Sequence, residues 1–357
     1  MELNQKLIKK ILSSIFVWVM AMQFFVFLRF FASDVRSPFD PSQPVDILFT
    51  STAVGIVGVI LGIVYPIIDV LLENTGLTRR SYGFIILIKS LWHIGLILPL
   101  TTIIAFFVIS RAGVDFQFIP WIKFFLNKNV VVILTYTAII SFSINFFNQL
   151  NAKFGPGNLW KMLTGKFHHP RQEERIFMFL DLQSSTTHAE KLGHIKFSEL
   201  IQDCFRDLSV VIRYKAEIYQ YVGDEVVLSW SIQDGLENTN CLRAYYGYQG
   251  VLNKKKDYYL SKYGFVPFFK AGLNMGQVTI AEVGEIKREI AFHGDTLNTA
   301  ARIQGMCNEE GKGLLISERL AENIGKQNEF KTDLIGNVLL RGKENKLNVY
   351  SVTSENV

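Results

Sequence analysis

The chain has 357 residues, of which 49% are hydrophobic and only 19% are charged, with a formal net charge of +5. This composition is too apolar for an ordinary soluble protein, and nearly all of the excess lies in the first 150 residues. The small positive charge is explained by basic residues that flank apolar segments, so it argues against a nucleic-acid partner. We therefore expect a first part embedded in membrane lipid and a second, soluble part.

Four apolar stretches in the first part are long enough to cross the roughly 30 Å hydrocarbon core of a bilayer as helices. They lie at about residues 11–31, 47–68, 89–109 and 130–148. The first is too long for the apolar core of a secretory signal peptide, and no small-residue cleavage site follows it, so it should remain as an anchor. Residues 1–148 are expected to form an all-α transmembrane domain of four helices.

Basic residues next to the spans predict the orientation. Lysines precede the first span and Arg79 and Arg80 lie in the second loop, whereas the first loop is acidic. Arg111, Lys123 and Lys128 in the third loop work against this pattern. An even number of spans places both termini on one side, so we expect a multi-pass protein of the cell inner membrane with both termini and the second part in the cytoplasm. The odd number of widely separated cysteines fits reduced cytoplasmic thiols.

Three ionisable residues, Asp69, Lys89 and His93, lie in or near the spans, where such groups are costly. A sensing role fits them, and so does a structural one in which Asp69 and Lys89 snorkel from helix ends and His93 bonds a neighbouring helix. A transporter or channel is disfavoured, because the spans lack the paired Gly/Pro-broken segments of a secondary transporter.

Residues 149–171 are expected to form a jointed linker. The Gly-Pro-Gly run at 155–157 interrupts any helix that leaves the membrane, and the segment around Trp160 can form a short amphipathic turn at the interface. The adjacent His168 and His169 have no further ligands nearby in the sequence, which favours solvent-facing side chains over a metal site.

Residues 172–357 have the size of one further domain. Their patterns predict a strand at 175–182, a helix at 187–214, strands at 216–222 and 225–231, and a helix at 236–262. Strands follow near 266–275, 276–283 and 287–292, then a helix at 296–307, a strand at 313–317, a short helix, and strands near 336–341 and 347–352. The opening order of strand, helix, hairpin, helix and strand is that of an α+β ferredoxin-like fold, an antiparallel sheet with helices on one face.

Two aspartates predict a cation site in this domain. Asp181 interrupts an apolar strand, where a buried carboxylate needs a partner, commonly a divalent cation. Asp224 lies at a hairpin tip after Gly223, which tolerates the positive φ of a tight turn. In a ferredoxin-like sheet the hairpin lies beside the first strand, so both carboxylates can ligate cations that hold a triphosphate. Taken separately, each could equally pair with a basic side chain or close a hairpin.

The segment that follows Asp181 in the sequence is expected to bind phosphate. Ser184, Ser185 and Thr186 lead directly from the strand into a helix. Their hydroxyls and the free amides of the first helical turn form a natural seat for a triphosphate.

Asp295 is a plausible N-cap of a predicted helix. Asn298 and Arg302 follow it four residues apart and so project from one face of that helix. An amide and a guanidinium together can hold a ribose and neutralise charge on a phosphorus. A solvated helix face is the alternative. His293, just before this helix, is expected to cap or pack rather than to catalyse.

In these segments the chain resembles the catalytic domain of the class III nucleotidyl cyclases, the adenylyl and guanylyl cyclases. The matching segments, in the order of the family, are Phe179-Leu-Asp-Leu-Gln-Ser-Ser-Thr186, Val222-Gly-Asp-Glu225, Gly294-Asp-Thr-Leu-Asn-Thr-Ala-Ala-Arg302 and Arg341-Gly-Lys343. They span essentially all of residues 172–352, and such motifs in order are far more specific than any one alone.

The resemblance implies a homodimer with shared active sites, in which one subunit supplies the metal ligands and the other supplies Asn298 and Arg302. It implies that Asp181, Asp224 and the backbone carbonyl of Leu182 bind two Mg²⁺ or Mn²⁺ ions. Asn298 would orient the ribose and Arg302 would stabilise the developing charge. A catalytically silent nucleotide-sensing receptor is disfavoured, because both the metal aspartates and this second pair are present.

Near the end of the chain, Arg341 or Lys343 would contact the triphosphate. The implied reaction converts a nucleoside triphosphate into a 3′,5′-cyclic nucleotide and pyrophosphate.

The positions that read the base in the resembled family are Gln220 and Ala291 here. Adenylyl cyclases usually carry lysine at the first and aspartate or threonine at the second, and guanylyl cyclases usually carry glutamate and cysteine. Gln220 can donate and accept hydrogen bonds, whereas Ala291 offers no side-chain hydrogen bond. Gln220 could equally face solvent. The resemblance favours ATP and cyclic AMP, with GTP or a pyrimidine triphosphate as alternatives.

Overall fold

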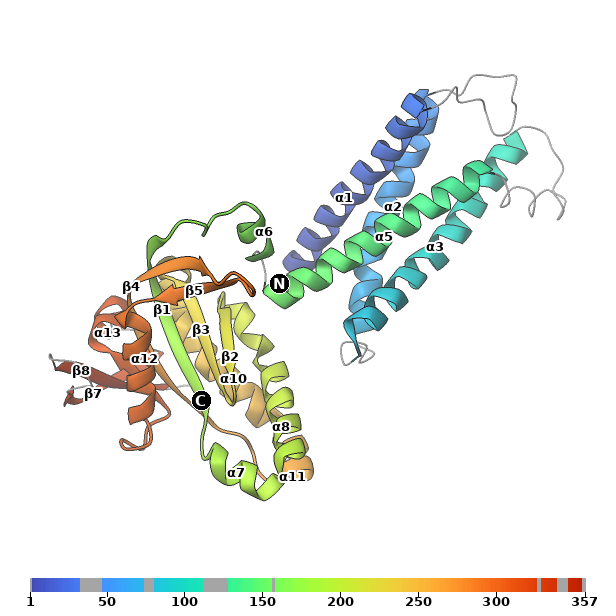
Figure 1. Ribbon diagram of the computed structural model, residues 1–357. Coiled ribbons are helices and arrows are strands. Elements are labelled where there is room, and N and C mark those ends of the chain that lie inside the picture. Colours follow the sequence, from blue (N-terminus) through green and yellow to red (C-terminus); the bar gives the residue numbers. More distant parts are fainter. Residues whose placement is uncertain are drawn as a thin grey trace. The chain divides into compact units, whose positions relative to one another are not determined.

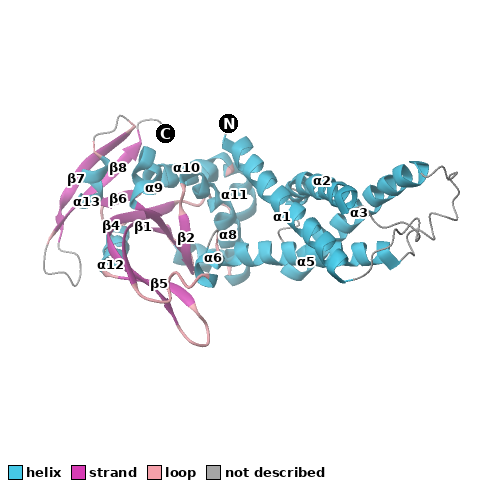
Figure 2. Ribbon diagram, turned by 90° about the horizontal axis from the view of Figure 1, so that it is seen from above, coloured by secondary structure: helices cyan, strands magenta, loops and turns pink. Residues whose placement is uncertain are grey.

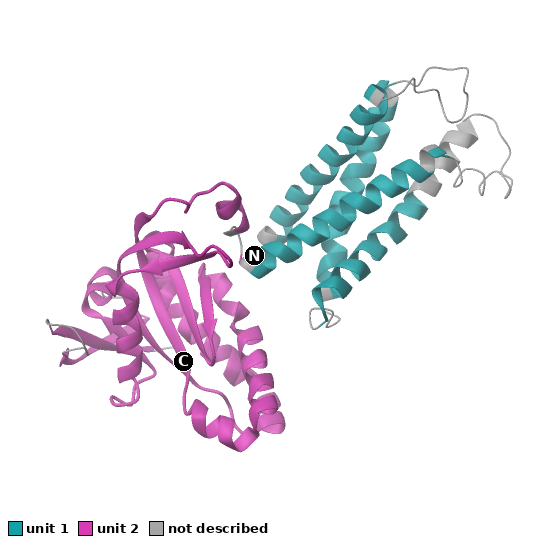
Figure 3. Ribbon diagram, viewed as in Figure 1, with its two compact units in different colours: residues 1–154 teal, residues 155–357 magenta. Residues whose placement is uncertain are grey.

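The computed structural model describes residues 2–32, 47–73, 80–111, 128–155, 158–325, 329–338 and 346–354. The chain divides into two compact units, Met1–Phe154 and Gly155–Val357 (Figure 3). Each unit has a hydrophobic core of its own.

Long helices make up the first unit (Figure 1): α1 (Glu2–Ala32), α2 (Ile47–Glu73), α3 (Tyr82–Arg111) and α5 (Lys128–Phe154). Each contains a stretch long and apolar enough to cross a membrane, at Leu7–Phe31, Thr50–Leu72, Tyr82–Leu100 and Val131–Lys153. The predicted four spans are therefore confirmed as helices that fit a membrane protein.

The third helix begins seven residues before the predicted start at 89. The predicted span began only at Lys89, because a lysine normally marks the end of an apolar span. In the structure Lys89 lies inside the helix, and its Nζ is 2.8 Å from Asp69 Oδ1 of α2. Both side chains are buried, so the expectation that they snorkel from helix ends is wrong.

Helices α1 and α2 approach each other at glycines. A Cβ on Gly62 would lie 2.4 Å from Ile15 Cα, and one on Gly58 would lie 2.9 Å from Val19 Cα. Small residues four apart let two membrane helices come into backbone contact. The Gly-x-x-x-Gly spacing at 58–62 is thus a packing signal that was present in the sequence.

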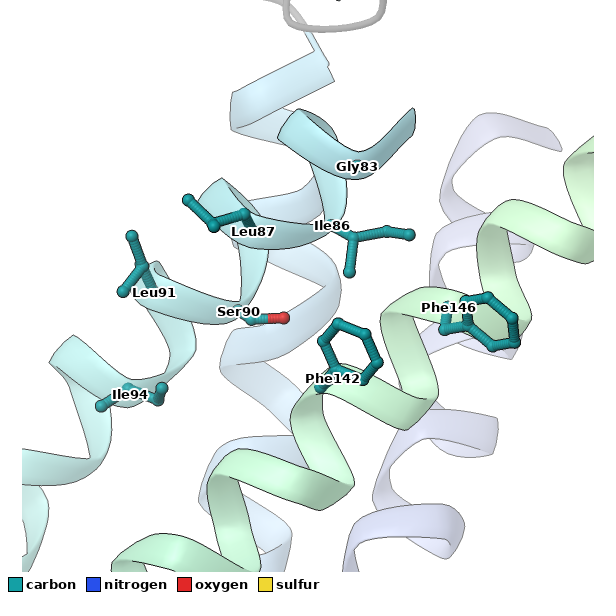
Figure 4. A pocket seen from close by; sticks show the side chains of 8 residues that line it. All are labelled: Gly83, Ile86, Leu87, Ser90, Leu91, Ile94, Phe142 and Phe146. Atoms are coloured by element: carbon teal, nitrogen blue, oxygen red, sulfur yellow. The ribbon is translucent and has the colours of Figure 1, made fainter. Parts of the chain in front are cut away.

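The interior of the first unit contains a polar network. Tyr65 of α2 donates to Asn145 Oδ1 of α5 at 2.6 Å and stacks on His93 of α3, with 3.7 Å between ring centroids. Ser141 Oγ lies 3.1 Å from His93 Nδ1, which confirms that His93 bonds a neighbouring helix. The outer face differs, because a groove of about 360 Å³ between α3 and α5 is lined almost entirely by apolar side chains such as Leu87 and Phe142 (Figure 4).

The second unit is built on a mixed sheet with strand order β2-β3-β1-β4-β6-β8-β7, and β5 pairs with β4. The strands are β1 (Arg171–Leu182), β2 (Glu217–Val222), β3 (Glu225–Ser231), β4 (Phe269–Val283), β5 (Glu289–His293), β6 (Leu314–Ser317), β7 (Phe330–Val338) and β8 (Leu347–Ser354). Strands β1 to β4 are antiparallel in the ferredoxin-like order, whereas β6 pairs with β4 in parallel. The predicted fold is confirmed, with a longer and mixed sheet.

The predicted strands 266–275 and 276–283 form one continuous strand, β4. The prediction placed a break before Gly276, because glycine often ends a strand. In the structure this glycine makes room for the helix above it, since a Cβ there would lie 2.6 Å from Thr296 Oγ1.

Helices cover both faces of the sheet, with α10 and α12 on opposite sides of the strands (Figure 2). On one face α8 (His194–Asp207), α10 (Asn240–Lys254) and α11 (Lys256–Tyr263) pack on the even-numbered side chains of β1, such as Met178. On the other face α12 (Asp295–Met306) packs with the odd-numbered Phe177. The expected arrangement, with helices on one face, therefore holds for the helices of the ferredoxin-like part. Helix α12, which follows that part in the chain, covers the other face.

Two predicted helices are subdivided in the structure. Residues 187–214 form α7 (Ser185–Leu192), α8 and a 3₁₀ helix (Leu208–Tyr214), with the first break at Gly193, whose φ is 73°. Residues 236–262 follow the short helix α9 (Ile232–Leu236) and divide into a 3₁₀ turn, α10 and α11. The remaining helices are α6 (Asn158–Leu163) and α13 (Glu318–Ile324).

The expected linker at 149–171 is partly folded onto the second unit. The helix α5 continues to Phe154 and α6 begins at Asn158. Phe167 is only 6% exposed and belongs to the core cluster beneath α12. Its carbonyl accepts a hydrogen bond from the Glu282 amide at 2.9 Å. His168 and His169 are exposed, as expected.

The contact between α12 and β4 depends on Gly272. A Cβ at this position would lie 2.1 Å from the Gln304 backbone nitrogen. We expect Gly272→Val to lower the free energy of unfolding by about 1–3 kcal/mol, because the helix must move off the sheet. Gly250→Ala in α10, where a Cβ meets nothing within 4 Å, is the control and should stabilise by up to about 1 kcal/mol. Thermal unfolding of both variants tests this, and equal melting temperatures would contradict the close contact.

Asp203 joins α8 to α11. It is 7% exposed and its Oδ2 accepts hydrogen bonds from Tyr258, Lys262 and Tyr263 at 2.5–2.8 Å. Burial opposes ionisation, but these bonds outweigh it and lower the pKa of Asp203 to about 2. A depressed carboxyl pKa stabilises the folded state above the unfolded pKa of about 3.9, and this contribution is lost as the pH falls through about 2.

We therefore expect Asp203→Asn to destabilise the protein by about 2 kcal/mol at pH 7. The difference from the unsubstituted protein should shrink as the pH falls from about 4 toward 2, because Asp203 then becomes neutral in both states. Urea unfolding at pH 7, 4 and 3 measures it. A difference that stays constant over this range would show that the ionised carboxylate is not the stabilising species.

Candidate active site

Strand pairing brings the two predicted metal aspartates together. Asp181 lies opposite Glu225 in the register of β1 and β3, and Asp224 precedes Glu225 in the β2–β3 turn. The turn contains Gly223 with φ of 64°, a conformation that favours glycine. Because side chains alternate along a strand, Asp181 projects from the α12 face, like Phe177.

The two aspartates interact in the structure. Burial, together with the charge of the Asp224 carboxylate and a hydrogen bond to it, raises the pKa of Asp181 to about 6. Burial also raises the pKa of Glu225 to about 7, with Asp181 and Asp224 as the next causes. Three carboxylates thus lie close enough to repel one another, an arrangement that a bound cation would relieve.

Two further residues contact or face Asp181. Gln304 Nε2 of α12 donates to Asp181 Oδ2 at 3.3 Å, and Lys270 lies directly opposite Asp181 on β4. Lys270 is 3% exposed, its Nζ donates to Asn308 Oδ1, and its charge lowers the pKa of Asp181. Neither residue was identified from the sequence, because their proximity depends on the register of β4 and on how α12 packs.

The donor set fits a Mg²⁺ or Mn²⁺ ion that is also held by its substrate. In the described part of the chain no group of three His, Cys, Asp or Glu side chains could hold a metal ion. Asp181 and Asp224 therefore offer two carboxylates, with the Leu182 carbonyl as a further oxygen. Mg²⁺ commonly uses one or two carboxylates together with water and substrate phosphates.

The predicted phosphate seat follows β1 directly. Ser184 has φ of 57° and precedes the first turn of α7 without making a side-chain capping bond. Ser185 is half-buried, whereas Ser184 and Thr186 are exposed. A non-glycine residue with positive φ is uncommon and holds this turn in a defined shape. Arg341 and Lys343, the other predicted triphosphate contacts, lie outside the described residues.

A second feature is a cavity of about 330 Å³ beside β2, lined by both Gln220 and Asn298. A β-bulge between Ile218 and Gln220 leaves Tyr219 without a partner residue on β3, and both Tyr219 and Gln220 line the cavity. Bulges often redirect side chains at functional sites. Phe179, Phe292 and Leu297 form an apolar part of the lining, and the rest of the cavity surface is mainly polar.

Ala291, the second predicted base position, is not among the described residues that line this cavity. Ala291 lies on β5 opposite Ala281, while His293 lines the cavity and is exposed. The expectation that His293 caps or packs is therefore wrong. The N-cap of α12 is Gly294, with φ of 151°. Asp295, predicted as the N-cap, is instead the first residue of the helix.

Asn298 and Arg302 lie one turn apart on α12, as predicted. Asn298 is exposed in the cavity, and Arg302 is half-buried. Within the described residues Arg302 makes no ion pair or hydrogen bond, so its guanidinium is available to an anion. Asp181, Asp224 and Arg302 are not among the residues that line the cavity. The cavity nevertheless reaches the turn that carries the pair, because Val222 and Glu225 line it.

Comparison with known proteins identifies the family. The family model for the Adenylate and Guanylate cyclase catalytic domain matches residues 167–354, more than half of the chain. Adenylate cyclase 2 of Rhizobium meliloti (strain 1021) is 31% identical over 223 residues, 62% of this chain and 61% of that protein. The adenylate cyclase of Anabaena cylindrica is 27% identical over 183 residues, 49% of this chain and 36% of that protein.

A solved bacterial light-regulated adenylyl cyclase has a TM-score of 0.53 at 18% identity, covering 62% of this chain and 65% of that one. That likeness shows the fold. Each match covers less than two thirds of the relative's own length. The chain belongs to the adenylate and guanylate cyclase catalytic domain family.

Proposed function

We propose that this protein is a membrane-bound nucleotidyl cyclase that converts ATP into 3′,5′-cyclic AMP and pyrophosphate for intracellular signalling. The pairing of Asp181 with Asp224 at the β2–β3 turn carries the proposal. Asp224 raises the pKa of Asp181, and carboxylates perturbed in this way gather at functional sites. The family match and the relatives named adenylate cyclase support this reaction.

In the proposed reaction the ribose 3′-hydroxyl attacks the α-phosphorus, the bond from that phosphorus to the pyrophosphate oxygen breaks, and the hydroxyl proton is released. Mg²⁺ or Mn²⁺, two per site, would promote deprotonation of the hydroxyl and neutralise the triphosphate. Asp181, Asp224 and the Leu182 carbonyl would hold the two ions through their oxygen atoms. Ser184, Ser185 and Thr186 donate to phosphate oxygens at the start of α7.

The cavity beside β2 is proposed to hold the nucleoside. Its volume of about 330 Å³ falls at the lower end of the range for small-molecule sites. Gln220 reads the base edge, Asn298 orients the ribose, and Arg302 stabilises charge on the phosphorus in transit. Glu225 lines this cavity but neither metal aspartate does, and we infer a homodimer in which each site combines the two aspartates of one subunit with the cavity of the other.

The four candidate spans support a membrane location for the first unit. Following the positive-inside argument, we propose a multi-pass inner-membrane protein with both termini and the cyclase domain, residues 172–357, in the cytoplasm. Residues 1–148 are the membrane domain, and the segment 149–171 connects the two.

Guanylyl or pyrimidine nucleotide cyclisation is the second candidate, and one observation favours it. Gln220 can match more than one base edge, and His293 lines the same cavity whereas Ala291 is not among its lining residues. A ring that both donates and accepts could read a base other than adenine.

Product analysis tests the proposed substrate. The detergent-solubilised protein is incubated with Mn²⁺ and each of ATP, GTP, CTP and UTP, and mass spectrometry identifies the products. We expect cyclic AMP to form with a kcat/KM at least about tenfold above that for any other nucleotide, a difference of about 1.4 kcal/mol in transition-state binding. A larger yield of another cyclic nucleotide would correct the base, and no cyclic product from any of them would contradict the function.

A further inference from the structure

A cavity with both polar and apolar lining residues lies among three helices of the first unit. Its volume is about 170 Å³, and Lys10, Trp18, Tyr65 and Asp69 are among its lining residues. The share of liquid volume taken by one water is about 30 Å³, so the cavity exceeds the size of a single water. It therefore has room for a small polar group.

Trp18 supplies a hydrogen-bond donor without an acceptor. The residue is 1% exposed, and its indole Nε1, the only polar atom of the side chain, has no hydrogen-bond partner. Buried donors are nearly always paired, and an unpaired one costs about 1–3 kcal/mol. Because Trp18 lines the cavity, a ligand there can provide the missing acceptor.

The neighbouring side chains are donors as well. Ser13 and Ser14 line the cavity on the same helix, and their hydroxyls make no hydrogen bond within the described part of the chain. Asn148 of α5 also lines it with a free amide. An indole N–H, two hydroxyls and an amide that face one space favour a ligand rich in acceptor oxygens.

The charges around the cavity favour a negative ligand. Asp69 is buried and forms its closer ion pair, at 2.8 Å, with Lys89. Lys10 Nζ is 3.7 Å from the other carboxylate oxygen, and its side chain remains 47% exposed. The close pair with Lys89 neutralises Asp69, so the ammonium of Lys10 at the cavity can also attract an oxyanion.

The cavity lies near one end of the spans. Lys10 is three residues inside the span Leu7–Phe31, and Asp69 is three residues before the end of Thr50–Leu72. At a rise of about 1.5 Å per residue, each lies about 5 Å from the end of its span. Both residues therefore lie near the border between the hydrocarbon core and the headgroup region.

We propose that this cavity binds a phosphate oxyanion, and that the headgroup of an anionic phospholipid is its source. The phosphodiester accepts from the Trp18 indole and the Ser13 and Ser14 hydroxyls and pairs with Lys10. This site is distinct from the nucleotide site, and its identification rests on the proposed membrane location of the first unit.

Lipid binding by the full-length protein tests the site. Delipidated protein in detergent is titrated with phosphatidylglycerol, phosphatidylcholine and glycerol 3-phosphate, and native mass spectrometry measures the bound fraction. Phosphatidylglycerol should bind at least about tenfold more tightly than phosphatidylcholine, whose choline cation Lys10 repels. Displacement of phosphatidylglycerol by glycerol 3-phosphate would show that the cavity is an oxyanion site whose ligand can also be a soluble phosphate ester.

Trp18→Phe is the diagnostic variant, because it keeps an aromatic ring near Tyr65 and removes the indole N–H together with the five-membered ring. We expect it to weaken phosphatidylglycerol binding about tenfold, as for a hydrogen bond to a charged group. Lys10→Gln should do the same. The matched control is Trp92→Phe, since Trp92 is 54% exposed on α3 and does not line the cavity.

Equal phosphatidylglycerol binding by Trp18→Phe and Trp92→Phe would overturn the proposal, and so would equal binding of both lipids by the unsubstituted protein. Melting temperatures of all variants show whether a loss comes from unfolding. Binding is measured without nucleotide, so this outcome is independent of whether the protein proves to be a cyclase.

Discussion

Asp181→Ala and Asp224→Ala should each abolish cyclic nucleotide formation, with a fall in kcat/KM of at least about a thousandfold. The two carboxylates are the only side chains assigned to the cations, and loss of metal charge stabilisation is worth several kcal/mol of barrier, or about tenfold for every 1.36 kcal/mol. The measurement is cyclic nucleotide formation by purified protein at saturating Mn²⁺. Full activity in either variant would end the metal assignment.

The matched control removes a carboxylate from the same unit without touching the site. Asp333 lies on β7, is exposed, and pairs with Lys331 at the surface. Exposed ion pairs of this kind contribute about 1 kcal/mol or less. Asp333→Ala should therefore keep both the fold and the activity, which separates loss of the metal ligand from a general effect of removing an aspartate.

The substitution Asp181→Asn separates catalysis from stability. Burial and the Asp224 charge disfavour ionised Asp181 in the folded protein. The neutral amide removes this cost, so Asp181→Asn should unfold at a higher temperature than the unsubstituted protein in the presence of a chelator at pH 7. The gain should be about 1–2 kcal/mol, since one pKa unit corresponds to about 1.4 kcal/mol. If ionised Asp181 instead stabilised the fold, Asp181→Asn would unfold at a lower temperature than the unsubstituted protein.

The approach of Asp181 and Asp224 could be predicted from the sequence because it follows from strand order. Once the order strand, helix, hairpin is identified, the first strand and the hairpin must be neighbours, and residues at the hairpin tip meet the end of the first strand. The register of Asp181 with Glu225 confirms this reasoning. Likewise, Asn298 and Arg302 share a face because helical spacing alone decides it.

The rest of the site depends on tertiary contacts that no local pattern encodes. Gln304 reaches Asp181 only because Gly272 lets α12 lie on β4. Gln220 lines the cavity beside a bulge at Tyr219, and a bulge cannot be read from alternation. In the first unit, the pairing of Lys89 with Asp69 turns two expected helix-end charges into an interior ion pair. The misses at Gln304 and Lys89 each concern a polar residue whose partner is distant in the sequence.

Mixing Asp224→Ala with Asn298→Ala subunits should restore activity that neither variant has alone. If each site takes its carboxylates from one subunit and Asn298 from the other, the heterodimer contains one site with all groups intact and one site with both changes. Closed two-fold symmetry then predicts about half of the unsubstituted activity per purified heterodimer. Two different affinity tags allow the heterodimer to be isolated before cyclic nucleotide formation is measured.

The pair of Asp181→Ala with Asp224→Ala is the control that makes this result specific. Both residues belong to the carboxylate half, so each site of that heterodimer lacks one metal ligand and no activity should return. Asn298 lines a cavity that contains Gln220 and Glu225 but neither metal aspartate, and complementation is expected if the aspartates of one subunit act with Asn298 of the other. Isolated heterodimers of Asp224→Ala and Asn298→Ala that stay inactive, or equal recovery in the control pair, would mean that each subunit builds its site alone.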